Sequence, residues 1–100
     1  MIDPSKISGF QWGAGNDRKS VEKHGVSMAE AEQVFFNTPL LMLEDAAHSS
    51  AEIRIHALGK TDEGRALHLT FTLRNAETLI RVISARNMHR KERAIYEHSN

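Results

Sequence analysis

The side chains of this chain that could do chemistry are histidine, glutamate and arginine, and most of them fall in its second half. This combination suits cleavage of an RNA phosphodiester without a metal ion. In that reaction the ribose 2′-OH needs a base, the leaving 5′-oxygen needs an acid, and the charge at phosphorus needs cationic donors. Histidine serves either proton role near neutral pH, and the arginine fork matches phosphate oxygens. The residue types permit an RNA-cleaving site, but they do not establish one.

Positive charge is concentrated near the C-terminal end, although the chain is neutral overall. Residues 1–50 carry 4 lysines and arginines against 7 acids, whereas residues 51–100 carry 9 against 6. Within residues 74–93 six cations face two acids, and five of the six are arginine. A local field of this sign attracts phosphate or an acidic protein segment. Taken alone, such a run is most often a solvated helix face.

Several other kinds of site find no support in the sequence. The chain has no cysteine and its histidines form no HExxH motif, so neither a metal nor another cofactor is expected. A phosphate-cradling GxxxxGK[ST] loop and a G-x-S-x-G hydrolase elbow are both absent. No apolar run reaches the roughly 18 residues of a membrane span, and no secretory signal is visible. We therefore expect no membrane association and a cytoplasmic location.

The elements that must position these residues follow from composition and periodicity. One hundred residues, 40% apolar and 26% charged, are typical of one globular domain, which we expect to span residues 1–100. Apolar alternation and turn residues predict strands over 7–12, 40–44, 52–58, 65–74 and 79–85, and helices over 16–25, 27–36 and 87–98. The order predicts an α+β fold: an antiparallel β-meander of four to five strands with two N-terminal helices and one C-terminal helix.

Local motifs predict where two of the helices begin and which face one of them buries. Ser27 and Glu30 have the spacing of a capping box at the start of the second helix. Asn87 is predicted to cap the third helix. Met88 and Ile95 are seven positions apart, which predicts that they share a buried face of that helix.

Arg81 and Arg86 raise a question of geometry. Successive side chains of a strand alternate between its two faces, so residues five apart point to opposite sides. Both arginines can serve one site only if the strand ends or bulges near Ser84. In a regular strand Arg86 is the better candidate.

Separated motifs along the chain resemble those of the BrnT family, the toxins of bacterial type II toxin–antitoxin systems. In chain order the matching pieces are F-x-W at Phe10 and Trp12, KHGVS from Lys23 to Ser27, D-x-x-HS-x-x-E-x-R from Asp45 to Arg54, LG at Leu58 and Gly59, GR at Gly64 and Arg65, IRVISAR from Ile80 to Arg86, and ER-x-x-Y from Glu92 to Tyr96. Each piece is weak alone, but together they keep their order and spacing over nearly the whole chain.

The resemblance implies a compact fold similar to RelE toxins and an endoribonuclease that cleaves RNA and inhibits translation. It also implies a BrnA-like antitoxin, a heterotetramer of two toxins and two antitoxins, and operator DNA bound only through the antitoxin. With the residue types, it predicts three sets of residues. The catalytic candidates are His24, His48, Glu52, Arg65, Arg81 and Arg86, the RNA-binding candidates are Lys23, Trp12 and Arg54, and the antitoxin-binding candidates are Arg90, Lys91 and Arg93.

Two other functions remain open. A non-catalytic module that binds RNA or an acidic partner would use the same arginines. It is favoured by Gly13 and Asn16, which stand where the family usually carries an acid and a lysine. A DNA-binding protein is less well supported, because no helix-turn-helix with a basic recognition helix is apparent.

Structural roles compete with each functional candidate. His24, next to Gly25, could close a helix C-terminus, where a cation meets the helix dipole favourably. Glu52 and Arg54 could form an ion pair that only stabilises the fold. Three further histidines are read as structural, namely His56, His68 and His98.

Overall fold

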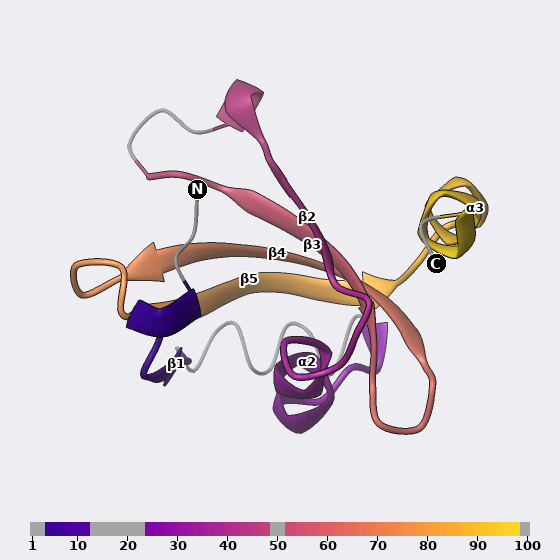
Figure 1. Cartoon of the computed structure of the whole chain (residues 1–100), viewed down its shortest axis with the longest axis horizontal. Helices are drawn as coiled ribbons and strands as arrows, with labels where there is room; N and C mark the ends of the chain where they lie inside the picture. The colour runs from indigo at the N-terminus through magenta and orange to yellow at the C-terminus, as the bar shows by residue number, and fades with distance from the viewer. Residues whose placement is uncertain (1–3, 13–23, 49–51, 99–100) are drawn as a thin grey trace.

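The computed structural model describes residues 4–12, 24–48 and 52–98, and it is built around a five-stranded sheet (Figure 1). The strand order across the sheet is β1-β5-β4-β3-β2. The strands are β1 (Gly9–Gln11), β2 (Leu41–Glu44), β3 (Ile55–Lys60), β4 (Ala66–Arg74) and β5 (Leu79–Asn87). The antiparallel meander predicted for β2 to β5 is confirmed, whereas β1 pairs in parallel with β5 and lies outside the meander.

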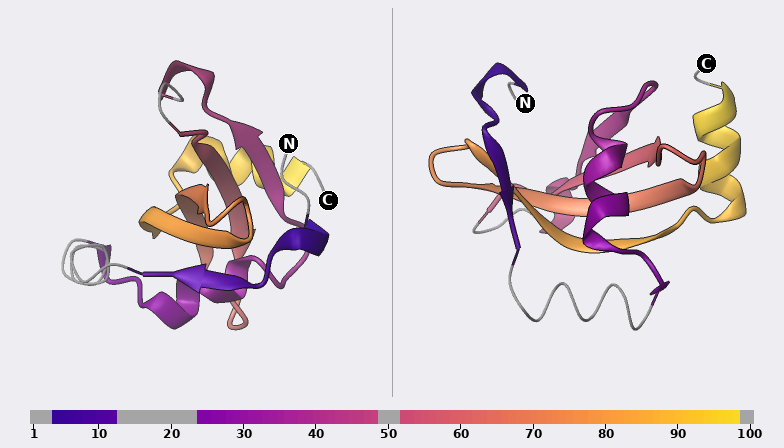
Figure 2. Two further views of the ribbon diagram at one scale, coloured as in Figure 1. Left: turned by 90° about the vertical axis from the view of Figure 1, so that its left-hand side faces the viewer. Right: turned by 90° about the horizontal axis from the view of Figure 1, so that it is seen from below.

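Two helices lie on opposite sides of the sheet (Figures 1 and 2). Helix α2 (Met28–Val34) lies under one face, and α3 (Arg90–His98) lies beside the end of β5 on the other side. Two short 3-10 helices, η1 (Pro4–Lys6) and η2 (Ala46–His48), complete the described elements. The helix predicted over 16–25 falls almost wholly outside the described residues. Within the described ranges, no helix has the length and apolar character needed to cross a membrane.

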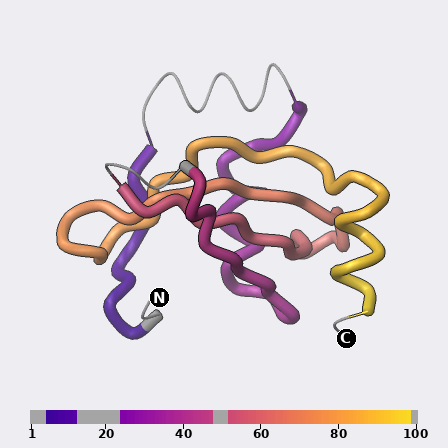
Figure 3. Tube along the Cα trace, turned by 90° about the horizontal axis from the view of Figure 1, so that it is seen from above, coloured from indigo at the N-terminus to yellow at the C-terminus, as the bar shows by residue number. Residues whose placement is uncertain are grey.

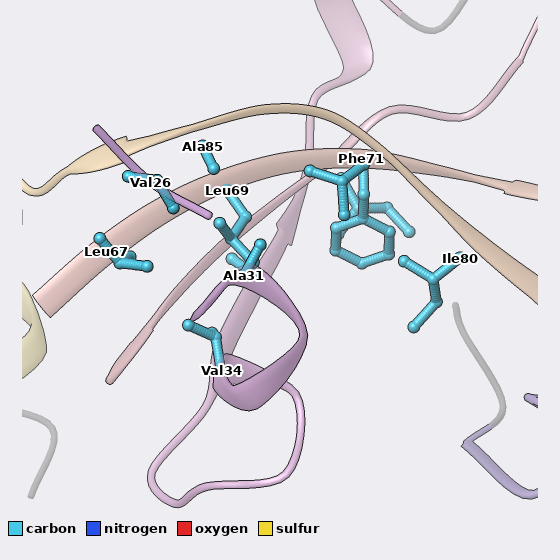
Figure 4. Close-up of a cluster of buried hydrophobic side chains, with 11 residues drawn as sticks. Val26, Ala31, Val34, Leu67, Leu69, Phe71, Ile80 and Ala85 are labelled. Atoms are coloured by element: carbon cyan, nitrogen blue, oxygen red, sulfur yellow. The ribbon is translucent and has the colours of Figure 1, made fainter. Parts of the chain in front are cut away.

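The face of the sheet toward α2, here called the core face, is apolar (Figure 4). Alternation along β3, β4 and β5 sends every second side chain to this face. Gly59 allows α2 to approach closely, because a Cβ at this position would lie 2.6 Å from Val34 Cγ1. The buried cluster comprises Val26, Ala31, Val34, Ile55, Ala57, Leu67, Leu69, Phe71, Ile80, Val82 and Ala85.

The capping box predicted at the start of α2 is confirmed. The Glu30 N–H donates to Ser27 Oγ at 3.1 Å, and the Ser27 N–H donates to Glu30 Oε1 at 3.0 Å. Two donors that the helix backbone leaves without partners are thereby satisfied. The start of α2 is thus a property of the local sequence.

The predicted start of α3 is wrong. Asn87 is the last residue of β5, where it pairs with Leu67, and the helix begins at Arg90. His89 stands before the helix in place of Asn87, and its N–H donates to the carboxylate of Glu92 in the first turn at 2.8 Å. Ladder pairing with β4 extends β5 past the point where the local sequence first permits a helix.

The predicted buried face of α3 is also wrong. Met88 is buried but precedes the helix, and Ile95 is 58% exposed. The helix is held instead by buried Tyr96, whose hydroxyl donates to the Pro39 carbonyl at 2.6 Å. The Lys60 ammonium lies 5.7 Å from the Tyr96 ring centroid. One aromatic anchor therefore fixes α3 at the end of the sheet.

A β-bulge in β5 answers the question about the two arginines. Thr70 pairs with Ser84, but the next residue of β4 pairs with Val82, so Ile83 is an extra residue in β5. The extra residue reverses the alternation beyond it. Arg81 and Arg86 consequently project from the same face, opposite the core face.

This second face, here called the polar face, is the one seen from above in Figure 3. Helix α3 lies at one end of the sheet and the β4–β5 turn at the other, and β2 forms the edge beside β3 (Figures 1 and 3). Cross-strand register places the side chains of the polar face in rows, because partners opposite each other in a sheet point to the same side. Its members on β3, β4 and β5 include His56, His68, Thr70, Thr72, Arg81, Ser84 and Arg86.

Candidate functional site

His56 lies at the centre of the polar face, with both ring nitrogens engaged. Its Nε2 is 3.0 Å from Asp45 Oδ2, and its Nδ1 is 3.0 Å from Thr70 Oγ1. An ionised carboxylate only accepts, so the proton of a neutral ring belongs on Nε2, and Nδ1 accepts from the Thr70 hydroxyl. The side chain of His56 is 34% exposed. It is therefore a partly exposed histidine whose ring is oriented at both nitrogens.

His68 stands beside His56 with its ring buried. The two ring centroids are 5.0 Å apart, and the His68 side chain is only 12% exposed. Burial, followed by the positive charge of Arg86, lowers the pKa of His68 from 6.5 to about 4. Its Nδ1 is buried without a hydrogen-bond partner. At neutral pH His68 is thus an uncharged ring with one unused polar atom.

Arg86 and Glu92 form a two-point ion pair next to the histidines. Arg86 Nη1 and Nη2 donate to the two Glu92 oxygens at 2.8 and 2.9 Å, and Nη1 also donates to the Asn87 carbonyl at 3.1 Å. The hydrogen bond from Arg86, supported by the one from the His89 N–H, lowers the pKa of Glu92 from 4.5 to about 2. A guanidinium has more N–H donors than these contacts use, so Arg86 retains capacity for an anion.

A polar pocket lies on the same face, next to the histidines and around Thr72. Glu52, Arg54 and Arg81, all predicted as site residues, are among its lining side chains, together with Thr72, Arg74 and Ile83. Arg74 Nε is 2.8 Å from Glu52 Oε2. The structure therefore brings Arg81 and Arg86 to one face, but it pairs Glu52 with an arginine and not with a histidine.

Other predicted site residues lie on the α2 side of the sheet. Arg65 Nη1 donates to Glu30 Oε2 at 3.0 Å and to the Gly25 carbonyl at 2.8 Å, and its Nη2 reaches the His24 carbonyl at 3.3 Å. Trp12 packs against the core and donates from Nε1 to Glu32 Oε2 at 2.7 Å. These contacts join chain segments, and they do not bring Arg65, His24 or Trp12 to His56.

The structure gives less information on the remaining predicted residues. Lys23 lies outside the described residues, and His48 ends η2 with its side chain beyond description. The three cations proposed for the antitoxin are all exposed on α3, namely Arg90, Lys91 and Arg93.

The strongest cluster contains residues that sequence reasoning did not select. His56 and His68 were read as structural, although each alternates with apolar residues and so belongs to a strand's polar side. Asp45 and Glu92 stood in the motifs that carried the resemblance, but no role was assigned to them. Alternation was thus a signal for the two histidines, whereas Asp45 and Glu92 meet them only through the packing of the segment after β2 and of α3.

Metal ligands do not gather here. In the ranges that the structure describes, no group of three or more His, Cys, Asp or Glu side chains could hold a metal ion. The arrangement offers a proton acceptor at His56, an uncharged buried ring at His68, and a cation at Arg86. The first and the last are groups that an attack on a phosphodiester by a neighbouring hydroxyl uses, a base for the hydroxyl and a cation for the charge at phosphorus.

Comparisons with known proteins agree on one family. The model of the family described as the ribonuclease toxin BrnT of type II toxin–antitoxin systems matches residues 12–92. A crystal structure of the ribonuclease toxin BrnT from Brucella abortus is similar, with a TM-score of 0.62 and 17% sequence identity. The match covers 84% of this chain and 100% of that chain, and at this identity it shows the fold alone. A search of curated proteins found no match.

Proposed function

Because this chain belongs to the BrnT family of ribonuclease toxins of type II toxin–antitoxin systems, we propose that it cleaves RNA on its polar face and so inhibits translation. The observation that carries the proposal is the geometry of His56. Its ring is held by Asp45 on one nitrogen, partly exposed, and adjacent to His68. Such a ring can move a proton without reorienting.

His56 is proposed to take the proton of the RNA 2′-OH at Nδ1. The substrate hydroxyl replaces the Thr70 hydroxyl as the hydrogen-bond partner of that atom, and the Asp45 carboxylate stabilises the imidazolium that forms. The 2′-oxygen then attacks phosphorus as the bond to the 5′-oxygen breaks. A water molecule supplies the proton to the leaving oxygen, and the hydroxide that remains is neutralised by the proton that His56 then releases. The products are a 2′,3′-cyclic phosphate and a 5′-hydroxyl end.

Arg86 is proposed to bind the phosphate that reacts. Its guanidinium is fixed by Glu92, so it need not reorganise as negative charge grows on the phosphate oxygens. His68 lies between Arg86 and His56 on the same face and is uncharged at neutral pH.

Membership in a type II system implies a protein antitoxin as partner. We propose a BrnA-like antitoxin that assembles with the toxin in a two-to-two complex and alone carries the operator-binding part. Its contact on this chain is proposed to include the exposed cations of α3, Arg90, Lys91 and Arg93. An acidic antitoxin segment would be complementary to that charge.

His56→Ala provides the direct test of the cleavage site. We expect the variant to lose RNA cleavage by at least about a hundredfold, since general acid–base groups typically contribute that much or more. It should still bind a non-cleavable 2′-O-methyl RNA, because the phosphate-binding arginines remain. His98→Ala, at the exposed end of α3, is the matched control and should cleave like the unchanged protein. Equal cleavage by His56→Ala would move the reaction elsewhere on the protein.

The competing function, RNA binding without cleavage, is an outcome of the same assay. If the unchanged protein binds 2′-O-methyl RNA but leaves unmodified RNA intact under all conditions, the polar face is a binding surface and no more. The resemblance of the fold to a ribonuclease toxin would stand in that case.

A further inference from the structure

We propose that Arg54, Arg74 and Arg81 form a second phosphate-binding pocket, which holds an RNA phosphate two steps along the strand from the one being cleaved. The inference rests on the proposed RNA-cleaving function and extends it from one phosphate to two. It also assigns Glu52 to this pocket, as the partner of Arg74, in place of a role in proton transfer.

The pocket is a polar hollow of about 210 Å³ lined by Glu52, Arg54, Thr72, Arg74, Arg81 and Ile83. Arg81 pairs with Thr72 across β4 and β5, so both project from the polar face. Three arginines and one acid give the hollow an excess of positive charge. Arginine is the residue that best matches the planar, two-point recognition of phosphate.

Two arginines of this pocket, Arg74 and Arg81, make contacts of imperfect geometry. Glu52 forms its ion pair with Arg74, and although Nε and Oε2 are 2.8 Å apart, Arg74 Nε makes no well-aligned hydrogen bond. Arg81 Nη1 lies 3.5 Å from Gln11 Oε1, a long contact compared with an ordinary hydrogen bond. A phosphate oxygen would replace the long Gln11 contact of Arg81 with a shorter, charge-assisted hydrogen bond.

The floor of the pocket is fixed to the cleavage site. Buried Thr72 donates from its hydroxyl to the Ile53 carbonyl at 2.8 Å, which holds the segment before β3 against β4. The Asp45 N–H donates to the Arg54 carbonyl at 2.7 Å. The residue that orients His56 is therefore bonded directly to the segment that carries Arg54. The two sites keep a constant separation, as two positions on one RNA strand require.

The spacing of the two sites fits a single strand. His56 bonds Thr70, and the pocket begins two residues further along β4 at Thr72. Arg86 lies opposite His68 and Arg81 opposite Thr72, four residues further along β4, which is a span of roughly 13 Å. This span is comparable with two phosphate steps of extended RNA, so an RNA strand laid along β4 would place one phosphate near Arg86 and the second one after it near Arg81.

The test measures binding separately from cleavage. A fluorescent, mixed-sequence 2′-O-methyl octanucleotide is titrated with the protein by anisotropy over a series of salt concentrations. We expect Arg81→Ala to weaken binding severalfold and to reduce the salt slope by about 0.7, the value for one phosphate contact on a single strand. Arg81→Lys should keep most of the slope. Lys6→Ala, which removes one cation outside the pocket, should leave both quantities unchanged.

Glu52→Gln gives a second, opposite expectation. Removing the carboxylate frees Arg74 and takes one negative charge from the pocket, so the variant should bind the octanucleotide more tightly and cleave RNA with a lower KM. A collapse of kcat in Glu52→Gln would restore Glu52 to proton transfer and overturn this assignment.

The two proposals fail separately. Unchanged binding in Arg81→Ala, or an equal loss in Lys6→Ala, would remove the pocket while leaving cleavage by His56 untouched. In cleavage assays Arg81→Ala should raise KM with little change in kcat, whereas His56→Ala lowers kcat. Arginine-dependent binding without any cleavage would keep the pocket and remove the ribonuclease function.

Discussion

The Arg86 guanidinium and the Glu92 carboxylate meet through two parallel hydrogen bonds of 2.8 and 2.9 Å. The pair joins β5 to the first turn of α3, and Glu92 also accepts the His89 N–H. One contact therefore orients a candidate phosphate-binding cation and anchors the helix that carries the proposed antitoxin surface. A substitution at either residue should affect both features.

Arg86→Ala is expected to abolish growth inhibition when the protein is expressed in a host cell. Loss of one oriented charge donor typically lowers a rate by about 10²–10³. Because the substitution also leaves Glu92 without its partner, the urea midpoint of the purified variant must be measured beside its cleavage rate. Glu92→Ala is the matched control, since it loosens α3 to a similar degree but keeps the cation. An Arg86→Ala protein as toxic as the original would exclude the role proposed for Arg86.

Stability should fall in mild acid because of His68. Its pKa is about 4 in the folded protein against 6.5 for an ordinary histidine, so the unfolded chain binds the proton more tightly. His68 therefore costs no stability above about pH 6.5, and the free energy of unfolding decreases as the pH falls from there toward about 4. Urea unfolding at about pH 7 and about pH 5 should show a drop that is smaller in His68→Gln. His98→Gln, at an exposed site, should behave like the unchanged protein, and an undiminished drop in His68→Gln would place the acid sensitivity in other groups.

Cleavage is expected to persist in excess EDTA and to spare single-stranded DNA. A mechanism that uses the RNA's own 2′-OH needs no metal-activated water, and DNA lacks the nucleophile. End-labelling of the products should reveal 5′-hydroxyl ends. Activity that disappears in EDTA and returns with magnesium would instead indicate a metal-dependent reaction, as would cleavage at a 2′-deoxy scissile position. Family membership would be unaffected by either result.

Reversal of charge on α3 should slow capture of the antitoxin. We expect Arg90, Lys91 and Arg93, changed together to glutamate, to reduce the association rate more than they increase the dissociation rate. The effect should be largest at low salt, where exposed charges are least screened. Surface plasmon resonance across a salt series would measure the association and dissociation rates, with Lys6→Glu as a charge-reversal control. Association that is insensitive to these substitutions would locate the antitoxin elsewhere.

The local sequence was sufficient for elements whose signals are complete within a few residues. The capping box of Ser27 and Glu30 and the apolar alternation of β4 each indicate structure without reference to distant parts of the chain. Distributed motifs were also sufficient for the family, because a set of weak matches in order is specific when no single match is. Strand β1 lacks such a signal: three residues can pair in either direction, and its parallel alignment depends on β5.

The candidate site was decided by the tertiary structure, through register. A shift of one residue would turn a whole strand over, so no single strand shows that His56 and His68 face each other. The bulge at Ile83 brings Arg81 and Arg86 to one face, and it exists only in the pairing of β5 with β4. Asp45 reaches His56 because β2 and β3 are neighbours. The sequence by itself determined the family, the strands and which histidines and arginines are present. The assembly of these side chains into one site depended on cross-strand pairing, which is a relation between segments distant along the chain.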